Sequence, residues 1–284
     1  MQTLTTKTKA AVLIEAMPYL RKFHDKIIVV KLGGSISIER DKLINLCEDI
    51  VLLNLVGIKT VIIHGGGKMV SKLQTELGQT PLFHNGLRVT DEKAFESALM
   101  VLAGPANKEI VSKINSSGGN AVGLTGADGK TIIAHKKKSE IDLGMVGEIE
   151  KVNTALVEKL LSSDFIPVIA PICISVNGKL YNVNADEAAS WIASRLAAEK
   201  LIYLSDVQGL MDSGNRLIPK AKIADIALLK RGKIIADGMI PKVTSAVSAI
   251  TGGVKKVHII DGRLAHSLLI ELFTKSGIGT EITK

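Results

Sequence analysis

The sequence predicts an α/β fold in which helices cover a parallel sheet, and two observations carry this prediction. First, the strand-like apolar runs 27–30 and 60–63 are each followed by a helical stretch, at 40–55 and at about 69–77. Such alternation of strands and helices is typical of parallel sheets. Second, aromatic residues make up only 3% of the 284 residues, so the core has to be built from Ile, Val, Leu and Ala. That composition suits closely packed strands and helices.

The rest of the chain extends this pattern. We expect helices and strands where the apolar residues have the period of each element, and hairpins at short polar turns. The predicted helices lie at 10–23, 91–117, 153–161, 238–250 and 265–274, with one more beginning at Asn184. The predicted strands lie at 121–124, 131–135, 144–149, 165–170, 202–204 and 256–260, with hairpins at 81–89 and around Asn177–Gly178.

The first predicted helix, at 10–23, precedes the first strand as an appendage. It either covers an edge of the domain or serves as an oligomerisation arm. No repeat or low-complexity linker divides the remaining chain, which we interpret as one unit with two lobes. We place the helical extension at 1–24 and the lobes at 25–178 and 179–284.

The net charge of +8 predicts an anionic partner, either a polyanion or a small phosphate or carboxylate. The basic residues are scattered, and the densest run, Lys136–Lys138, is followed at once by Glu140 and Asp142. We interpret this run as a solvated hairpin rather than a nucleic-acid patch. The scarcity of aromatic residues also argues against a protein that stacks nucleic-acid bases.

The cysteines and the hydropathy of the chain indicate the cellular compartment in which we expect the protein. Cys47 and Cys173 lie in separate apolar runs, and no CxxC motif occurs. This pattern indicates neither a zinc site nor a disulfide framework and points to a reducing compartment. No signal peptide is recognisable, and no uninterrupted apolar segment is long enough to span a bilayer. We therefore expect a cytoplasmic protein without a membrane partner.

Glycine-rich loops follow the first two predicted strands, at Gly33–Gly34 and at Gly65–Gly67. The second is not a Walker loop, because Ile62 stands where that motif requires glycine, and no GxGxxG follows a strand. Glycines between a strand and a helix still let backbone N–H groups approach an anion, and the helix dipole adds attraction. Either loop alone can also be a tight turn without a ligand. Two such loops at neighbouring strand ends indicate that two anions meet there.

Charged residues accompany these loops. Lys31 ends an apolar strand, where burying an ammonium group is costly unless an anion meets it. Lys242 lies near a helix start, where a bound phosphate would offset the unfavourable dipole, although it also fits a surface lysine. Asp186 occupies the first turn of a helix, which stabilises a carboxylate in any case, and Asp206 follows a strand, where ligands gather in open α/β sheets. His64 precedes the second loop, but no Ser or Cys nucleophile pairs with it, so a hydrolase triad is not indicated.

Eight short segments, in chain order, carry a more specific signal. They are KLGGS (31–35), HGGGK (64–68), NGLRVTD (85–91), NKEIV (107–111), YNVNAD (181–186), SDVQGL (205–210), GMIPKV (238–243) and HIIDGR (258–263). Together they resemble the amino acid kinase family and, within it, the branch that phosphorylates N-acetyl-L-glutamate. KxGG and HGGG are shared across the family, whereas GLRVTD, NVNAD and GMIPKV together are much more specific. The resemblance covers residues 24–284.

The resemblance implies a three-layer αβα sandwich with an open, mainly parallel sheet, the acyl amino acid in the N-terminal lobe and ATP in the C-terminal lobe. It implies that Lys31 and Lys242 stabilise the transferring phosphoryl group, that Asp186 orients both lysines, and that Arg88 grips the substrate α-carboxylate. The implied substrate contacts are Gly66, Gly67, Arg88, Asn182 and Asn184, and the implied nucleotide contacts are Gly33, Gly34, Ser205, Asp206 and Gly209.

The implied chemistry agrees with the residues present. A side-chain carboxylate acceptor is already ionised at neutral pH, so no general base is needed. Positioning and charge stabilisation by lysines, glycine amides and Mg²⁺ carried by ATP then have to supply catalysis. The protein itself is expected to hold no metal. Lys68 stands where relatives often have proline, and we interpret it as a bystander. Other departures from the family pattern, which leave the two lysines in place, are Leu32, Ser35, Thr125 and Ala127.

The ends of the chain resemble a regulatory device. The first helix, around Tyr19, resembles the helix that interlaces dimers into a hexamer in arginine-inhibited members. His258, Glu271 and Gly277 resemble their arginine site. The resemblance therefore implies a hexameric trimer of dimers inhibited by L-arginine, and the alternative is a dimer whose helix only covers an edge.

Three other functions stay open at this point. The first is a sibling kinase that acts on N-acetyl-aminoadipate or on carrier-linked glutamate, which only the size of the pocket can decide. The second is a catalytically silent sensor on the same fold, against which the presence of Lys31, Asp186 and Lys242 argues. The third is a nucleic-acid binder, motivated only by the charge.

Overall fold

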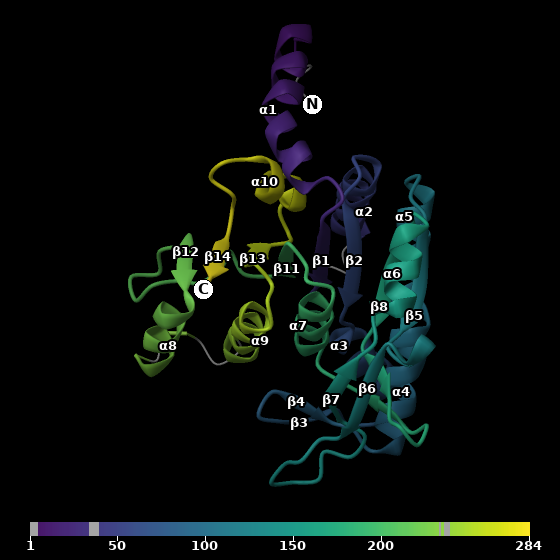
Figure 1. Cartoon of the computed structure of the whole chain (residues 1–284). Helices are drawn as coiled ribbons and strands as arrows, with labels where there is room; N and C mark the ends of the chain where they lie inside the picture. The colour runs from purple at the N-terminus through teal and green to yellow at the C-terminus, as the bar shows by residue number, and fades with distance from the viewer. Residues whose placement is uncertain (1–4, 34–39, 233, 236–238) are drawn as a thin grey trace.

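A mainly parallel sheet runs through the computed structural model, which describes residues 5–33, 40–232, 234–235 and 239–284 (Figure 1). Within those residues the sheet has eight strands, in the order β12-β14-β13-β11-β1-β2-β8-β5. Neighbouring strands are parallel except for β13 and β14. The strands are β1 (Ile27–Leu32), β2 (Lys59–His64), β5 (Ala121–Thr125), β8 (Ile166–Ala170), β11 (Lys200–Ser205), β12 (Lys220–Lys222), β13 (Lys256–Asp261) and β14 (Thr280–Thr283).

Helices cover both faces of this sheet. One layer contains α2 (Arg40–Leu55), α5 (Pro105–Ser116) and α10 (Ser267–Phe273). The other contains α6 (Ala155–Ser162), α7 (Ala185–Arg195) and α9 (Ile240–Thr251). The predicted α/β class, a three-layer αβα sandwich, is confirmed.

The side chains of β1 alternate between the two helical layers. Val30 and Leu32 pack in the core beneath α2, whereas Val29 packs in the core beneath α7 and α9. Because side chains alternate with a period of two along a strand, Lys31 shares the face of Val29. This alternation brings the lysine at the strand end to the start of α7, where it meets Asp186.

The single helix predicted at 91–117 is wrong. The structure has two helices, α4 (Glu92–Ala103) and α5, separated at Gly104 and Pro105. Proline lacks an N–H group, and its ring clashes with the carbonyl group one turn earlier, so a helix ends before it and a new one can begin with it. Elements that the sequence did not predict are β12, β14, α8 (Ile223–Arg231) and a short 3₁₀ turn, η2 (Asp128–Lys130).

A second sheet and a hairpin lie beside the central sheet (Figure 1). The second sheet has the order β10-β9-β6-β7, and β3 pairs with β4 in the hairpin. The predicted hairpin at 81–89 is confirmed, as is the turn at Asn177–Gly178, where Gly178 has a φ of 85°. The strands are β3 (Leu82–His84), β4 (Leu87–Val89), β6 (Ile132–Lys136), β7 (Gly147–Val152), β9 (Ile172–Ile174) and β10 (Leu180–Asn182), and α3 (Gly67–Glu76) follows β2.

The first helix, α1 (Thr6–Phe23), projects away from the body of the molecule (Figure 1). Thr5 caps it, because the Thr5 hydroxyl accepts a hydrogen bond from the N–H of Thr8 at 3.2 Å. Leu13 and Ile14 are more than 60% exposed on this helix, at 67% and 69%. Neither α1 nor any other helix in the described part of the chain is long and apolar enough to cross a membrane.

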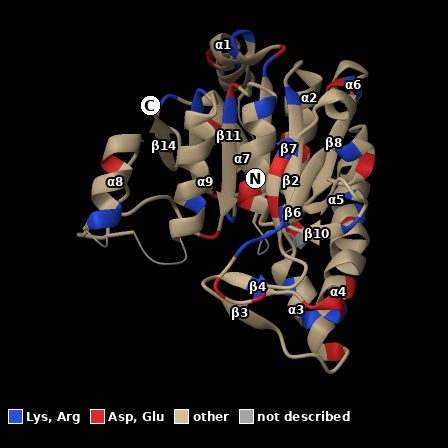
Figure 2. Ribbon diagram, turned by 60° about the horizontal axis from the view of Figure 1, so that its bottom comes forward, with Lys and Arg blue, Asp and Glu red and all other residues tan. Residues whose placement is uncertain are grey.

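Charged residues are interspersed over the molecule (Figure 2). In the basic run predicted to be a solvated hairpin, Lys136 pairs with Asp142 at 2.7 Å, and both side chains are at least half exposed. That interpretation is confirmed for this pair.

Candidate active site

Three neighbouring strands of the central sheet end at one edge and carry the candidate residues. β1 lies between β2 and β11 and is parallel to both, so the carboxyl ends of the three strands meet. The chain leaves β1 for β2 on one side and later returns to β11 on the other. Such a topological switch point is where open α/β sheets bind their ligands.

At this edge a single carboxylate bridges two lysines. Asp186 Oδ1 lies 2.7 Å from Lys31 Nζ, and Asp186 Oδ2 lies 3.0 Å from Lys242 Nζ. All three residues are buried. Two ammonium groups share one carboxylate, so the cluster keeps an excess of positive charge. The structure thus brings together the three residues that the sequence singled out.

The pKa values in this cluster follow from burial and from mutual charge. Burial alone would raise the pKa of Asp186, but the charges and hydrogen bonds of the two lysines outweigh it and lower that pKa to about 2. Burial lowers the pKa of Lys242, and the charge of Lys31 lowers it further, while Asp186 opposes both. Asp186 is therefore ionised at any working pH, and it holds both ammonium groups in place.

A tyrosine that the sequence analysis missed supports this cluster. Tyr203 of β11 is fully buried, and its hydroxyl donates a hydrogen bond to the backbone oxygen of Asp186 at 3.2 Å. The Lys242 ammonium group lies 5.1 Å from the centre of its ring, within the range of cation–π attraction. The signal for this residue in the sequence was a tyrosine that stands between aliphatic residues of a buried strand. It is enough to indicate a polar partner but not to say which one.

A cavity of about 250 Å³ adjoins the cluster. It is closed on one side by the β3–β4 hairpin, which contributes Phe83 and Arg88. The predicted site residues that line it are Lys31, Gly66, Gly67, Arg88, Asn182, Asn184 and Asp186. Residues far apart in the sequence thus share one cavity, as the resemblance implied.

Arg88 is held in this cavity by neutral partners. Its guanidinium group donates hydrogen bonds to the Gly67 oxygen at 2.9 Å, to Ser71 Oγ at 2.7 Å and to Gln74 Oε1 at 2.5 Å. The same group stacks over the Phe83 ring at 4.7 Å. Within the described residues no carboxylate lies within ion-pair distance of it. Its charge is therefore available to an anionic ligand.

The two asparagines of the cavity differ. Asn182 Oδ1 is buried and has no hydrogen-bond partner among the residues that the structure describes, so a ligand donor would satisfy it. Asn184 Oδ1 instead caps α7, accepting from the N–H groups of Asp186 at 2.8 Å and Glu187 at 3.3 Å. The predicted helix start at Asn184 is confirmed, and this cap fixes where Asp186 stands.

Packing gives a separate reason for two of the glycines that the resemblance predicts as nucleotide contacts. A Cβ on Gly33 would lie 2.8 Å from the Leu204 oxygen, and one on Gly209 would lie 2.6 Å from Thr280 Oγ1. Ser205 ends β11 and Asp206 follows it. Gly34 lies outside the described residues. The described residues contain no group of three or more His, Cys, Asp or Glu side chains that could share a metal ion.

Comparison with known proteins agrees with this geometry. The sequence model of the amino acid kinase family matches residues 26–261. The chain belongs to that family. An acetylglutamate kinase from Aquifex aeolicus is 49% identical to it over 97% of both chains. Another, from Methanobrevibacter smithii, is 46% identical and covers 96% of this chain and 98% of its own.

Solved structures confirm the amino acid kinase fold. N-acetylglutamate synthase from Neisseria gonorrhoeae, complexed with coenzyme A and N-acetyl-glutamate, has a TM-score of 0.88 at 32% identity. That match covers 97% of this chain, which spans only 63% of the synthase. Carbamate kinase from Giardia lamblia, at 16% identity and a TM-score of 0.66, shares the fold alone.

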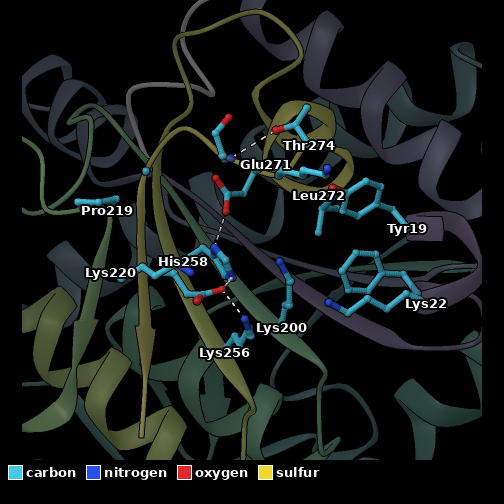
Figure 3. A pocket seen from close by; sticks show the side chains of 16 residues that line it. Tyr19, Lys22, Lys200, Pro219, Lys220, Lys256, His258, Glu271, Leu272 and Thr274 are labelled. Carbon is cyan, nitrogen blue, oxygen red and sulfur yellow. Dashed lines mark hydrogen bonds and ion pairs between the residues drawn. The ribbon is translucent and has the colours of Figure 1, made fainter. Parts of the chain in front are cut away.

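A second pocket of this amino acid kinase, of about 300 Å³, lies at the amino ends of β11 and β13 (Figure 3). Tyr19 of α1 lines it together with His258, Glu271 and Gly277, so the structure brings together the four residues predicted for an effector site. His258 Nδ1 lies 2.5 Å from Glu271 Oε1, and Glu271 Oε2 accepts from the Ile278 N–H at 2.8 Å.

Lys200 is a further residue of the second pocket, which the sequence analysis missed. Its ammonium group lies 5.2 Å from the Phe23 ring. No carboxylate among the described residues lies within ion-pair distance of it. Burial lowers the pKa of Lys200 to about 8, although the charge of Glu271 opposes this shift. A lysine that opens a buried strand was the signal in the sequence.

Proposed function

We propose that this protein transfers the γ-phosphoryl group of ATP to the side-chain carboxylate of N-acetyl-L-glutamate, a step of arginine biosynthesis. The observation that carries the proposal is one cavity lined by Lys31 and Asp186 of the cluster and by Arg88, whose partners among the described residues are all neutral. The acetylglutamate kinases that share nearly the full length of the chain support the same reaction.

The cavity offers a complementary group for each end of this substrate. Both Nη2 hydrogens of Arg88 are already donated to neutral partners, so Arg88 would take the α-carboxylate bidentately by exchanging one of these partners for the anion. Lysine cannot make such a planar contact. Asn182 Oδ1 would accept the N–H of the acetamido group, which satisfies a buried atom that has no hydrogen-bond partner in the described part of the chain. The side-chain carboxylate then reaches toward Gly66, Gly67 and Lys31.

The residues of the cluster would catalyse transfer by position and charge. The acceptor carboxylate is already ionised, so the barrier lies in bringing it against the ATP phosphates. ATP would supply the phosphoryl group, and Mg²⁺ bound to its phosphates would neutralise part of their charge. Lys31 and Lys242, fixed by Asp186, would bind the oxygens of the transferring group. Donors that are preorganised in this way need no rearrangement as charge develops.

An ADP-release assay tests this proposal. N-acetyl-L-glutamate should support turnover, while glutamate, aspartate and UMP should not. Hydroxylamine should trap the acyl phosphate product as a hydroxamate. N-acetyl-aminoadipate, which is one methylene longer, tests the sibling function. If it were phosphorylated faster than N-acetyl-L-glutamate, the proposed substrate would be wrong.

We also infer that L-arginine inhibits this enzyme through the second pocket. Buried Glu271 offers a carboxylate to a guanidinium group, and Lys200, which has no ion-pair partner among the described residues, offers an ammonium group to a carboxylate. A structure of the N. gonorrhoeae synthase complexed with coenzyme A and L-arginine matches this chain with a TM-score of 0.85 at 30% identity. Millimolar arginine should lower turnover, and no effect would remove this inference.

The exposed apolar side chains of α1 support the further proposal that this helix joins dimers into a hexamer. Because Tyr19, Lys22 and Phe23 of the same helix line the second pocket, assembly and inhibition would be linked. Light scattering should give a hexamer for the full chain and a dimer once α1 is deleted.

A further inference from the structure

A buried histidine adjoins the second glycine loop. His64 ends β2, is fully buried and directly precedes Gly65. Its Nδ1 lies 2.9 Å from the backbone oxygen of Gly65, and its Nε2 lies 3.1 Å from Asn107 Nδ2. Both ring nitrogens therefore have partners. His64 is not among the residues that line the cavity, although Gly65, Gly66 and Gly67 are.

The partners of Asn107 decide which nitrogen of His64 carries the proton. Asn107 Nδ2 lies 2.9 Å from the Val168 backbone oxygen, which can only accept, so this atom is the amide nitrogen. Its second hydrogen then points to His64 Nε2 at 3.1 Å, which is nearer than the Leu124 backbone oxygen at 3.4 Å. Because an amide nitrogen donates and does not accept, Nε2 must be the acceptor. The proton therefore resides on Nδ1, which donates it to the Gly65 oxygen. Burial lowers the pKa of His64 to about 4, and the charge of Lys108 lowers it further against the bond to Gly65, so the ring is neutral at working pH.

The hydrogen bond from His64 Nδ1 to the Gly65 oxygen fixes the orientation of the Gly65–Gly66 peptide group. The Gly65–Gly66 peptide is trans, since the described chain has no cis bond. In a trans peptide the C=O of one residue and the N–H of the next point in opposite directions. A Gly65 oxygen pinned to the His64 ring therefore turns the Gly66 N–H away from that ring.

We propose that His64 is a positioning residue that, as a neutral Nδ1–H tautomer supported by Asn107, aims the Gly66 N–H at the transferring phosphoryl group. This role rests on the proposed function, and it assigns His64 to orientation and not to acid–base chemistry. The glycines allow the loop several backbone conformations, and the hydrogen bond from His64 fixes one orientation of the Gly65–Gly66 peptide.

The tautomer can be measured without turnover. In protein labelled with ¹⁵N-histidine, long-range ¹H–¹⁵N correlations distinguish Nδ1–H, Nε2–H and imidazolium rings. Of the six histidines, the one whose signals disappear in His64→Asn should show the neutral Nδ1–H pattern across the neutral pH range. An Nε2–H or imidazolium pattern for His64 would overturn the proposal, whether or not the enzyme phosphorylates N-acetyl-L-glutamate.

Two substitutions of His64 distinguish a role in orienting the Gly66 N–H from a role in packing alone. His64→Leu cannot donate to Gly65 and should lower kcat by roughly 10- to 100-fold, as expected for a misaimed transition-state donor, with KM for the acyl substrate nearly unchanged. His64→Asn can donate from its amide to Gly65 and should keep kcat within a few-fold of the wild type. His135→Leu, at an exposed histidine, serves as the matched control.

The outcomes of these experiments are distinct. Equal kcat values for the Leu and Asn variants of His64, at equal melting temperature, would contradict the proposed role. An unmeasurable wild-type turnover would instead contradict the proposed function, and the tautomer would still decide the role of His64.

Discussion

Strand β11 has an ion cluster near each end, and the two clusters are built in opposite ways. Near the carboxyl end, Asp186 bridges Lys31 and Lys242, and both of its oxygens are used. At the amino end, Glu271 is bonded to His258, while Lys200 has no acidic partner within ion-pair distance in the described residues. The first cluster is complete without a ligand in the sense that each lysine contacts the carboxylate, whereas the second leaves Lys200 without an ion-pair partner in the described part of the chain.

This difference fits the two roles that we propose, a catalytic centre at Asp186 and an effector site at Glu271. A catalytic centre gains from charges that are already held in place when the transition state forms. An effector site gains from charges that only the ligand satisfies, because the ligand then stabilises one arrangement of the pocket. The six residues of β11 span roughly 17 Å, so the two sites can be altered separately although they share a strand.

The largest effect should come from the lysines of the complete cluster. Lys31→Ala or Lys242→Ala should each lower kcat by about 10²- to 10³-fold or more, because each removes a donor to the transferring group. Steady-state kinetics measures this loss. Calorimetric titration should give unchanged arginine binding, since the second pocket keeps all its residues.

Lys68→Ala is the matched control for these lysines. Lys68 directly follows the glycine loop, but it is exposed and has no place in the cavity. Its removal should leave turnover unchanged. Near-normal turnover in both variants of the complete cluster would remove the proposed catalytic role.

The second largest effect should be on the binding of the acyl substrate. Arg88→Ala should raise KM for N-acetyl-L-glutamate by roughly 10- to 100-fold, the usual worth of a hydrogen-bonded charge, with a smaller change in kcat. Arg88→Lys should recover little of the loss, because lysine lacks the planar fork. A large fall in kcat with an unchanged KM would instead place Arg88 at the transferring phosphoryl group.

The complete cluster could be predicted from the sequence because each member stands at a recognisable boundary. Lys31 ends a strand, Asp186 follows a helix cap, and Lys242 lies in the first turn of a helix. Tyr203 could not be predicted in the same way. Its partner, the backbone of Asp186, lies 17 residues earlier in the chain and is reached only when α7 packs against β11.

The parts of the fold that were missed also depend on distant contacts. β14 is a four-residue strand that pairs antiparallel with β13, and nothing local to residues 280–283 requires this pairing. The break between α4 and α5 is the opposite case, because Pro105 is a local signal that the predicted helix at 91–117 ignored. Gly209 was predicted as a nucleotide contact, and the close approach of Thr280 is a separate reason for a glycine there.

Lys200 of the second pocket predicts a pH effect on the proposed inhibition by arginine that turnover should not share. Lys200 has a pKa lowered to about 8, so it is charged below pH 8 and neutral above it. If it binds the carboxylate of arginine, the affinity should fall by up to about tenfold per pH unit above that value. Arginine titrations from below to above pH 8 measure this dependence.

Two substitutions isolate Lys200 from other groups that titrate in this range. Lys200→Met should bind arginine weakly at every pH and lose the step near pH 8. Lys200→Arg should keep the charge and move the step beyond this range. A step of the same size in Lys200→Met would show that a different group is responsible.

The smallest effect should come from a single methyl group beside Glu271. Gly277 has a φ of 60°, and a Cβ there would lie 2.7 Å from Glu271 Oε2. Gly277→Ala should therefore cost about 1–2 kcal/mol of backbone strain and also displace the carboxylate that would meet the guanidinium group of arginine.

Gly178→Ala provides the matched control, because Gly178 has a φ of 85° with nothing within 4 Å of the added Cβ. Both variants should lower the melting temperature, but only Gly277→Ala should weaken arginine inhibition. If both lost inhibition equally, backbone strain and not the position of Glu271 would control the second pocket, and its contrast with the cluster at Asp186 would disappear.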